Sequence, residues 1–206
     1  MNLKNNKVLK QDSENTIKKS NQISIADMSN GLTLNQLQLL AYAIYATQKS
    51  GVTEFRKAEF EKKFELKNFT IKEAKEDADK ITSVKFNVMD LENERFSFQN
   101  LFIGMNYDKG LFYFKFNPDL VHHILDLKEK YITTDLTIAS KFKSGFSWRL
   151  YDFLKAHYGF WYKDFTKQDL MQLFNVQNTK TYIRDTSVFK KIVLDRAISE
   201  INALTE

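Results

Sequence analysis

The sequence predicts an α+β fold, because helical patterns flank a stretch with strand periodicity. Apolar residues recur at helical spacing over residues 33–83, alternate with period two over residues 84–116, and return to helical spacing over residues 117–203. The 206 residues allow one large domain or two domains of about 100 residues each.

Composition excludes several classes of protein before any motif is considered. Hydrophobic residues make up 43% of the chain, enough to furnish a packed core, which excludes a chain disordered throughout. The chain has no cysteine, which excludes a disulfide framework and a thiolate metal site and fits an intracellular protein. No apolar run approaches the ~18 residues of a membrane span, and the N-terminus lacks the apolar segment of a secretory signal.

The N-terminal segment, residues 1–22, is polar, rich in Asn and Lys, and aperiodic. This pattern predicts a flexible tail, with order beginning near Ile23.

The first helical pattern covers residues 33–48, TLNQLQLLAYAIYATQ, and predicts a long amphipathic helix. Thr33 or Asn35 can cap its start, and Gly51 is placed to end it.

Three short elements are predicted next. Residues 52–55 favour a strand, residues 57–65 a short helix, and residues 70–83 a second helix that opens with the capping-box pair Thr70 and Glu73. Two short helices after a longer one are typical of a helix-turn-helix unit.

Strand periodicity then takes over in residues 84–91, 95–108 and 110–116. The turn residues at 108–110, Asp-Lys-Gly, predict a hairpin between the last two runs. Strands that follow a helix-turn-helix are the signature of a wing, so residues 23–116 resemble one winged-helix unit. The alternating aromatics Phe112, Phe114 and Phe116 are interpreted as core residues rather than base-stacking platforms.

The second half repeats this order without close sequence identity, which indicates a repeat of architecture. The predicted elements are a helix opened by Asn117-Pro118-Asp119, a joint over residues 131–135, helices over residues 135–141, 144–158 and 166–174, a short strand at Phe165, and a long helix over residues 186–203. We therefore expect a flexible tail over residues 1–22, a first winged-helix domain over residues 23–132, and a second over residues 133–206 that lacks its C-terminal wing hairpin.

The net charge of +5 is unevenly distributed. Residues 1–20 carry +3, residues 21–140 carry −2, and residues 141–206 carry +4. A basic segment attracts nucleic-acid phosphates, although a solvated lysine-rich surface would give the same count.

The two helix-turn-helix units differ in the charge of their second helices. Residues 70–82 carry −1, which repels phosphate, whereas residues 180–196 carry +3 and include several hydroxyl side chains near the helix start. This mixture suits phosphate anchoring and base-edge contact in a major groove, so we assign DNA binding to the second unit. A plain amphipathic helix with lysines on its wet face is the alternative.

Motifs for catalysis are missing from the sequence. The three histidines do not form a metal pair by their spacing, and no phosphate-binding loop, dinucleotide fingerprint or nucleophile elbow is present. We therefore expect no enzyme activity, no catalytic residue, no cofactor and no metal site.

Four segments resemble one family in its order: LTLNQLQLLAYAIY at 32–45, FYFKFNPDLVHHILDLKEKYI at 112–132, KFKSGFSWRLYDFLKAHY at 141–158, and YIRDTSVFKKIVLDRAISEIN at 182–202. The third carries a Ser-x-x-Ser-x-Arg-Leu-Tyr-x-x-Leu pattern formed by Ser144, Ser147, Arg149, Leu150, Tyr151 and Leu154. On these segments the chain is similar to the iteron-binding, theta-type plasmid replication initiators of the RepA/RepB/RepE superfamily.

The resemblance implies tandem winged-helix domains, in which the second domain reads repeated origin DNA and the first supports dimerisation and adds backbone contacts. It implies that monomers initiate replication and dimers repress the protein's own gene, in a bacterial cytoplasm and in association with plasmid DNA. Host replication proteins are possible further partners, and no membrane partner is expected.

Carried over to this chain, the resemblance assigns the DNA-binding residues. The recognition helix and its approach would hold Lys180, Thr181, Tyr182, Arg184, Ser187, Lys190 and Lys191, and phosphate contacts from the preceding scaffold helix would come from Ser144, Ser147 and Arg149. For Arg149, a structural salt bridge is an equal alternative. The family continues into a wing hairpin that this sequence lacks, so we expect this 206-residue form to bind iterons weakly or not at all while its first domain stays folded.

Two other functions fit the same elements. A protein-interaction or dimerisation module would bind partners with little salt dependence, whereas phosphate-driven binding weakens steeply as salt rises. A transcriptional repressor that never starts replication would need the same DNA contacts, so the sequence does not separate it from an initiator.

Overall fold

The computed structural model describes residues 15–20, 31–90, 94–125, 131–156 and 164–205. The first half contains β1 (Thr16–Ser20), α2 (Leu34–Ser50), β2 (Thr53–Arg56), α3 (Lys57–Lys63), α4 (Ile71–Thr82), β3 (Lys85–Asp90), β4 (Arg95–Asn100), β5 (Phe102–Asp108), β6 (Leu111–Phe116) and the 3₁₀ helix η3 (Pro118–His123). The second half contains β7 (Tyr131–Asp135), α5 (Leu136–Ala139), α6 (Gly145–Ala156), α7 (Lys167–Leu173), α8 (Lys180–Arg184), α9 (Thr186–Phe189), the π-helical turn η4 (Lys190–Leu194) and α10 (Asp195–Thr205).

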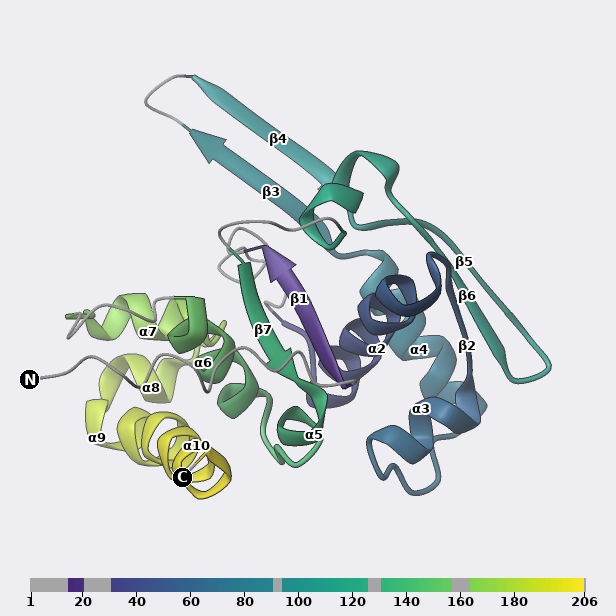
Figure 1. Cartoon of the computed structure of the whole chain (residues 1–206). Helices are drawn as coiled ribbons and strands as arrows, with labels where there is room; N and C mark the ends of the chain where they lie inside the picture. The colour runs from purple at the N-terminus through teal and green to yellow at the C-terminus, as the bar shows by residue number, and fades with distance from the viewer. Residues whose placement is uncertain (1–14, 21–30, 91–93, 126–130, 157–163, 206) are drawn as a thin grey trace, which may run out of the picture.

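These elements form two helix-turn-helix units side by side (Figure 1). The mixture of helices and strands confirms the predicted α+β winged-helix class. In the first unit, β2, β6 and β5 form a three-stranded antiparallel sheet beside α4, and β3 and β4 form a separate hairpin that projects from the body. Among the described residues of the second unit, β7 is the one strand.

Local signals placed several helix ends correctly. Thr33 caps α2 in a capping box with Gln36, and Gly51 ends the helix with φ of 76°, a left-handed conformation that glycine adopts without strain. The Thr70–Glu73 capping box begins α4 as predicted.

The wing of the first unit forms at the predicted turn. Lys109 and Gly110 have φ of 43° and 89°, the backbone of a tight hairpin turn between β5 and β6. The predicted strand over residues 95–108 is instead two strands, since β4 pairs with β3 and β5 pairs with β6, with the break at the buried Leu101. Phe112, Phe114 and Phe116 are buried, which confirms their interpretation as core residues.

The predicted flexible tail extended too far. Within residues 1–22, Thr16–Ser20 form β1, which pairs antiparallel with β7, and the side chain of Ile17 is fully buried. Residues 1–14 and 21–22 lie outside the described part of the chain. The predicted joint over residues 131–135 is likewise a strand, because it is the partner of β1.

Two other predictions in the second half differ from the structure. The helix opened by Asn117-Pro118-Asp119 is the 3₁₀ helix η3, with Asn117 as its cap, and Phe165 lies outside any strand. On α6, Trp148, Leu150 and Tyr151 are buried, whereas Leu154 is 48% exposed.

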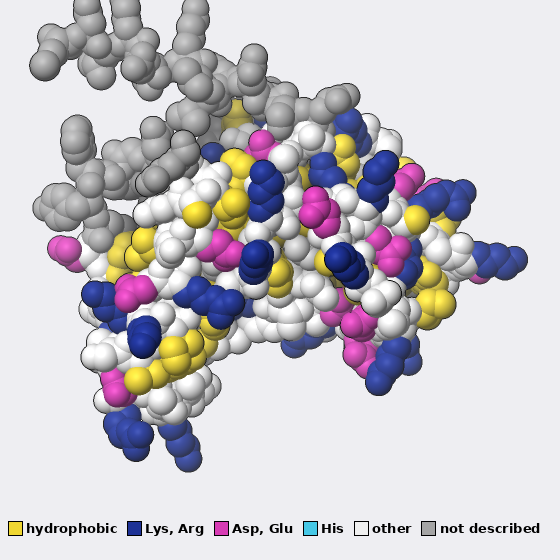
Figure 2. Space-filling view, turned by 90° about the horizontal axis from the view of Figure 1, so that it is seen from below, with side chains coloured by type: hydrophobic (Ala, Val, Ile, Leu, Met, Phe, Trp, Pro, Cys, Tyr) yellow, Lys and Arg dark blue, Asp and Glu magenta, His cyan; other side chains and the backbone are white. Residues whose placement is uncertain are grey.

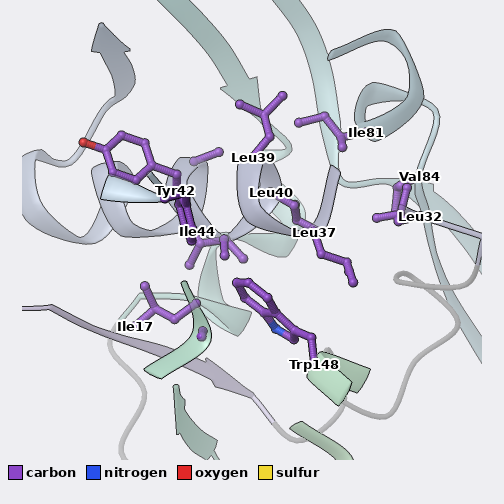
Figure 3. Packing of buried hydrophobic residues seen from close by; sticks show 14 of the residues in the cluster. Ile17, Leu32, Leu37, Leu39, Leu40, Tyr42, Ile44, Ile81, Val84 and Trp148 are labelled. Atoms are coloured by element: carbon purple, nitrogen blue, oxygen red, sulfur yellow. The ribbon is translucent and has the colours of Figure 1, made fainter. Parts of the chain in front are cut away.

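One hydrophobic core runs through both units. The indole of Trp148 on α6 lies between Phe64 of the first unit and Phe142, with ring centroids 6.3 Å apart in each case. Figure 3 shows Trp148 among side chains of α2, with Ile17 of β1 nearby. The two units are therefore packed against each other rather than strung on a linker.

A buried ion pair fastens β1 to this core. Lys19 donates to Asp152 of α6 at 2.5 Å, and the same carboxylate accepts hydrogen bonds from the Thr134 hydroxyl at 2.8 Å and the Trp148 indole at 3.1 Å. Lys19 and Asp152 are both more than nine-tenths buried. Since the carboxylate joins β1, β7 and α6, it holds together segments that are distant in the sequence.

We expect Asp152→Ala to lower the free energy of unfolding by about 3–5 kcal/mol, because it leaves the Lys19 ammonium buried without a partner. Urea denaturation measures this loss. The matched control is Lys57→Ala, which breaks the more exposed Lys57–Glu61 pair and should cost about 1 kcal/mol or less. The double variant Lys19→Met with Asp152→Leu should lose less than Asp152→Ala, and equal losses in all three variants would contradict the role assigned to this pair.

Candidate nucleic-acid interface

The second helix-turn-helix is built from α7, the turn that follows it, and a helix that runs without a break through residues 186–205. Thr166 and Asp169 form a capping box at the start of α7. Asp185 caps the long helix by accepting a hydrogen bond from the Val188 N–H at 3.1 Å. The predicted helix over residues 186–203 is thus present, preceded by the additional short helix α8.

The inward side of the long helix consists of Phe189, Val193, Ala197 and Ile201, all buried. These side chains pack toward α6 and the turn of the helix-turn-helix, and the Phe189 ring lies 6.4 Å from that of Phe174. Ile192 and Ile198 of the same helix are 47% and 41% exposed. The side of the long helix opposite these four buried residues therefore does not pack against the core.

The structure brings most of the predicted DNA-binding residues to this outer side. The exposed members are Lys180, Thr181, Arg184, Ser187, Lys190 and Lys191. Tyr182 is half-buried, with its ring 5.9 Å from that of Phe189, so its role is at least partly structural. Figure 2 shows lysine and arginine side chains projecting from the end of the molecule where the C-terminal helices lie.

The charges on this surface are not neutralised internally. Within the described part of the chain, Lys180, Arg184, Lys190 and Lys191 form no ion pair with a carboxylate. The corresponding helix of the first unit, α4, contrasts with this: its Lys72 lies 3.9 Å from Glu76, and its Asp77 is held by the amide of Gln36 at 2.9 Å. Burial raises the pKa of Asp77 above its ordinary value.

Lys167 makes a contact beside this basic surface that the sequence did not suggest. Its ammonium donates to the Ile183 carbonyl at 2.9 Å and to the Thr186 hydroxyl at 3.0 Å, which joins α7 to the end of α8 and the start of α9. No spacing rule signals such a contact, because its partners are a backbone oxygen and a side chain 16 and 19 residues away. Lys167 therefore orients the approach to the long helix.

The scaffold residues are placed differently from expectation. Ser144 is partly exposed and its hydroxyl accepts a hydrogen bond from the Phe146 N–H at 3.1 Å, next to the start of α6. Ser147 is fully buried and Arg149 is 7% exposed. Both side chains lie on the buried side of α6, so neither of them is available to a phosphate in this structure.

Arg149 instead fastens the two units together. Its guanidinium donates to the Leu32 carbonyl at 2.6 Å, just before α2, and to the Phe174 carbonyl at 2.9 Å, at the end of α7. The alternative of a structural salt bridge is also wrong, since its partners are backbone carbonyls. Burial lowers the pKa of Arg149 to about 10.

The arrangement defines a class: a protein of two packed winged-helix units that presents one basic helix to solvent. A family model described as the initiator replication protein, WH1, matches residues 16–155, from the first residue of β1 to the penultimate residue of α6. The chain belongs to this family of replication initiators. The comparison with curated proteins found no match.

The fold is similar to that in the crystal structure of the Pi initiator protein in complex with iteron DNA. The TM-score is 0.71 at 19% sequence identity, and the match covers 95% of this chain and 89% of the Pi chain. The similarity therefore includes both units. None of the helices in the described residues is long and apolar enough to cross a membrane.

We expect Arg149→Ala to lower the free energy of unfolding by about 2–4 kcal/mol, because it leaves two buried carbonyls without their donor. Arg149→Lys should recover part of the loss, since an ammonium cannot reproduce the forked geometry of the guanidinium. Chemical denaturation measures both. If Arg149→Ala unfolds at the same denaturant concentration as the unsubstituted chain, the structural role assigned to Arg149 is wrong.

Proposed function

We propose that this replication initiator binds repeated sequences at a plasmid origin through the outer side of α8 and the long helix. The observation that carries the proposal is a group of exposed cations that form no ion pair with a carboxylate of the described residues: Lys180, Arg184, Lys190 and Lys191. Such charges gain free energy when they displace counterions from DNA phosphates.

The geometry also suits sequence reading. A helix of a helix-turn-helix enters the major groove with residues near its N-terminus against base edges. Arg184 and Ser187 lie at this end of the long helix, and both are exposed. An arginine side chain can donate two hydrogen bonds to a guanine base, whereas a serine hydroxyl can bond to different bases. Arg184 would therefore select a base, and Ser187 would accept more than one.

The structural neighbour supports the nature of the ligand. The Pi initiator was crystallised with iteron DNA, and its fold matches nearly the whole of this chain. We therefore assign origin repeats as the partner, with the second unit over residues 133–206 as the reader and the first unit as the support. The role is that of a bacterial cytoplasmic, plasmid-associated DNA-binding protein without catalytic residues, cofactor or metal.

We expect Arg184→Ala or Lys190→Ala to weaken binding to the direct repeats beside the gene by about 1–3 kcal/mol where the side chain reads a base. Fluorescence anisotropy with repeat and scrambled duplexes at two salt concentrations gives the affinities. A side chain that contacts only phosphate will weaken both duplexes alike and reduce the salt slope by about one.

Lys62→Ala, which removes an exposed lysine of α3 in the first unit, is the matched control and should leave both affinities unchanged. If the unsubstituted chain shows no preference for the repeats, the proposed function is wrong. If it does, but neither substitution in the second unit matters, the recognition surface is misplaced.

We propose in addition that the first unit pairs two copies of the chain, the form that would repress the protein's own gene. Among the described residues, the projecting hairpin of β3 and β4 pairs with no further strand, so its strand edges are open there. On β4, Phe96 and Phe98 are 68% and 55% exposed and their rings lie 5.8 Å apart. An open edge beside exposed aromatic rings favours association with another strand.

We expect Phe96→Ser with Phe98→Ser to shift a dimer toward monomer, because the exposed rings that would be buried between copies are lost. Sedimentation velocity over a range of concentrations measures the shift. The thermal midpoint should be nearly unchanged, since neither ring belongs to the core. The control Ile71→Ser removes another exposed apolar side chain, 67% exposed on α4, and should leave association as it was.

A further inference from the structure

The long helix of the second unit contains one irregular turn. Between α9 and α10, residues Lys190–Leu194 form a π-helix, in which the Asp195 N–H donates to the Lys190 carbonyl five residues earlier. A π turn holds one residue more than the α-helical turn it replaces, and such turns are rare and frequently lie at functional sites. This one coincides with the two adjacent exposed lysines, Lys190 and Lys191.

The spacing of the buried residues accounts for the irregularity. Phe189, Val193, Ala197 and Ile201 are each separated by four residues, and all are buried. In a regular α-helix twelve residues turn through about 120° more than three full turns, so Ile201 would drift away from the face that carries Phe189. The wider π turn absorbs part of this drift and keeps the four side chains toward the core.

The same turn adds a residue to the outer surface. Lys190, Lys191 and Ile192 lie between the buried Phe189 and Val193, and all three are exposed. A regular helix with a spacing of three between core residues would place only two residues there. A helix one residue shorter at this turn could therefore pack the same four core residues without a π turn.

We propose that this π turn is a positioning device for DNA recognition, which sets the direction in which Lys190 and Lys191 leave the helix relative to Arg184 and Ser187. The inference rests on the proposed DNA-binding function of this helix. It assigns the turn a role in affinity for the repeats rather than in the stability of the fold. A regular helix with the same charged residues would present them at a different angle to the groove.

Deletion of Ile192 tests the proposal directly. It removes one residue from the turn and keeps every charged side chain of the helix. The spacing from Phe189 to Val193 falls to three, and the end-to-end drift of the four buried residues in a regular α-helix falls to about 20°. The deletion variant should therefore fold with an α-helical turn in place of the π turn.

The matched control is Ile192→Ala, which loses the side chain but keeps the length of the helix and its π turn. Amide hydrogen–deuterium exchange, thermal unfolding and anisotropy with the repeat duplex are measured for both variants. We expect similar thermal midpoints, and an affinity of the deletion variant at least about tenfold below that of Ile192→Ala, as for the loss of one base contact.

Each other outcome contradicts the proposal. Equal affinity of the two variants would mean that the turn has no role in DNA binding, and failure of the deletion variant to fold would mean that the core needs the turn. Failure of the proposed function is distinguished from both, because then neither Ile192→Ala nor the unsubstituted chain would prefer the repeat duplex.

Discussion

The carboxylate of Asp152 is the point on which the arrangement of the two units depends. It accepts hydrogen bonds from Lys19, Thr134 and Trp148, and so ties β1, β7 and α6 at one buried position. A buried charge is tolerated only where partners satisfy it, so this position admits few alternative packings. The N-terminal strand, the connection between the units and the scaffold helix of the second unit are thereby fixed together.

A second buried polar group extends this constraint to the recognition surface. Arg149 follows Trp148 on α6 and bonds to carbonyls before α2 and after α7. The turn that leads toward α8 and the long helix is consequently held against the first unit. The direction of the basic surface is therefore a property of the whole molecule, and the continuous core through both units supports the same conclusion.

The sequence predicted what is decided locally. The caps at Thr33 and Thr70 were correct, because each depends on residues within one helical turn. The strand β1 was missed, because its polar sequence becomes a strand only through pairing with β7, more than a hundred residues away. Most of the predicted DNA-binding residues are exposed, but the burial of Ser147 and Arg149 depends on tertiary packing that spacing along the chain does not encode.

The net charge of the chain does not show which cations are on the surface, because some of them are buried. Lys19 and Arg149 count toward the same total as Lys190 and Lys191, yet the first two are more than nine-tenths buried and bond to groups of the protein itself. Their charges stabilise the joint between the units and are not available to DNA. Lys180, Arg184, Lys190 and Lys191 are exposed and form no ion pair with any carboxylate in the part of the chain that the structure describes. The proposed attraction to DNA phosphates therefore rests on surface cations, and the buried cations help to set the orientation of the surface that carries them.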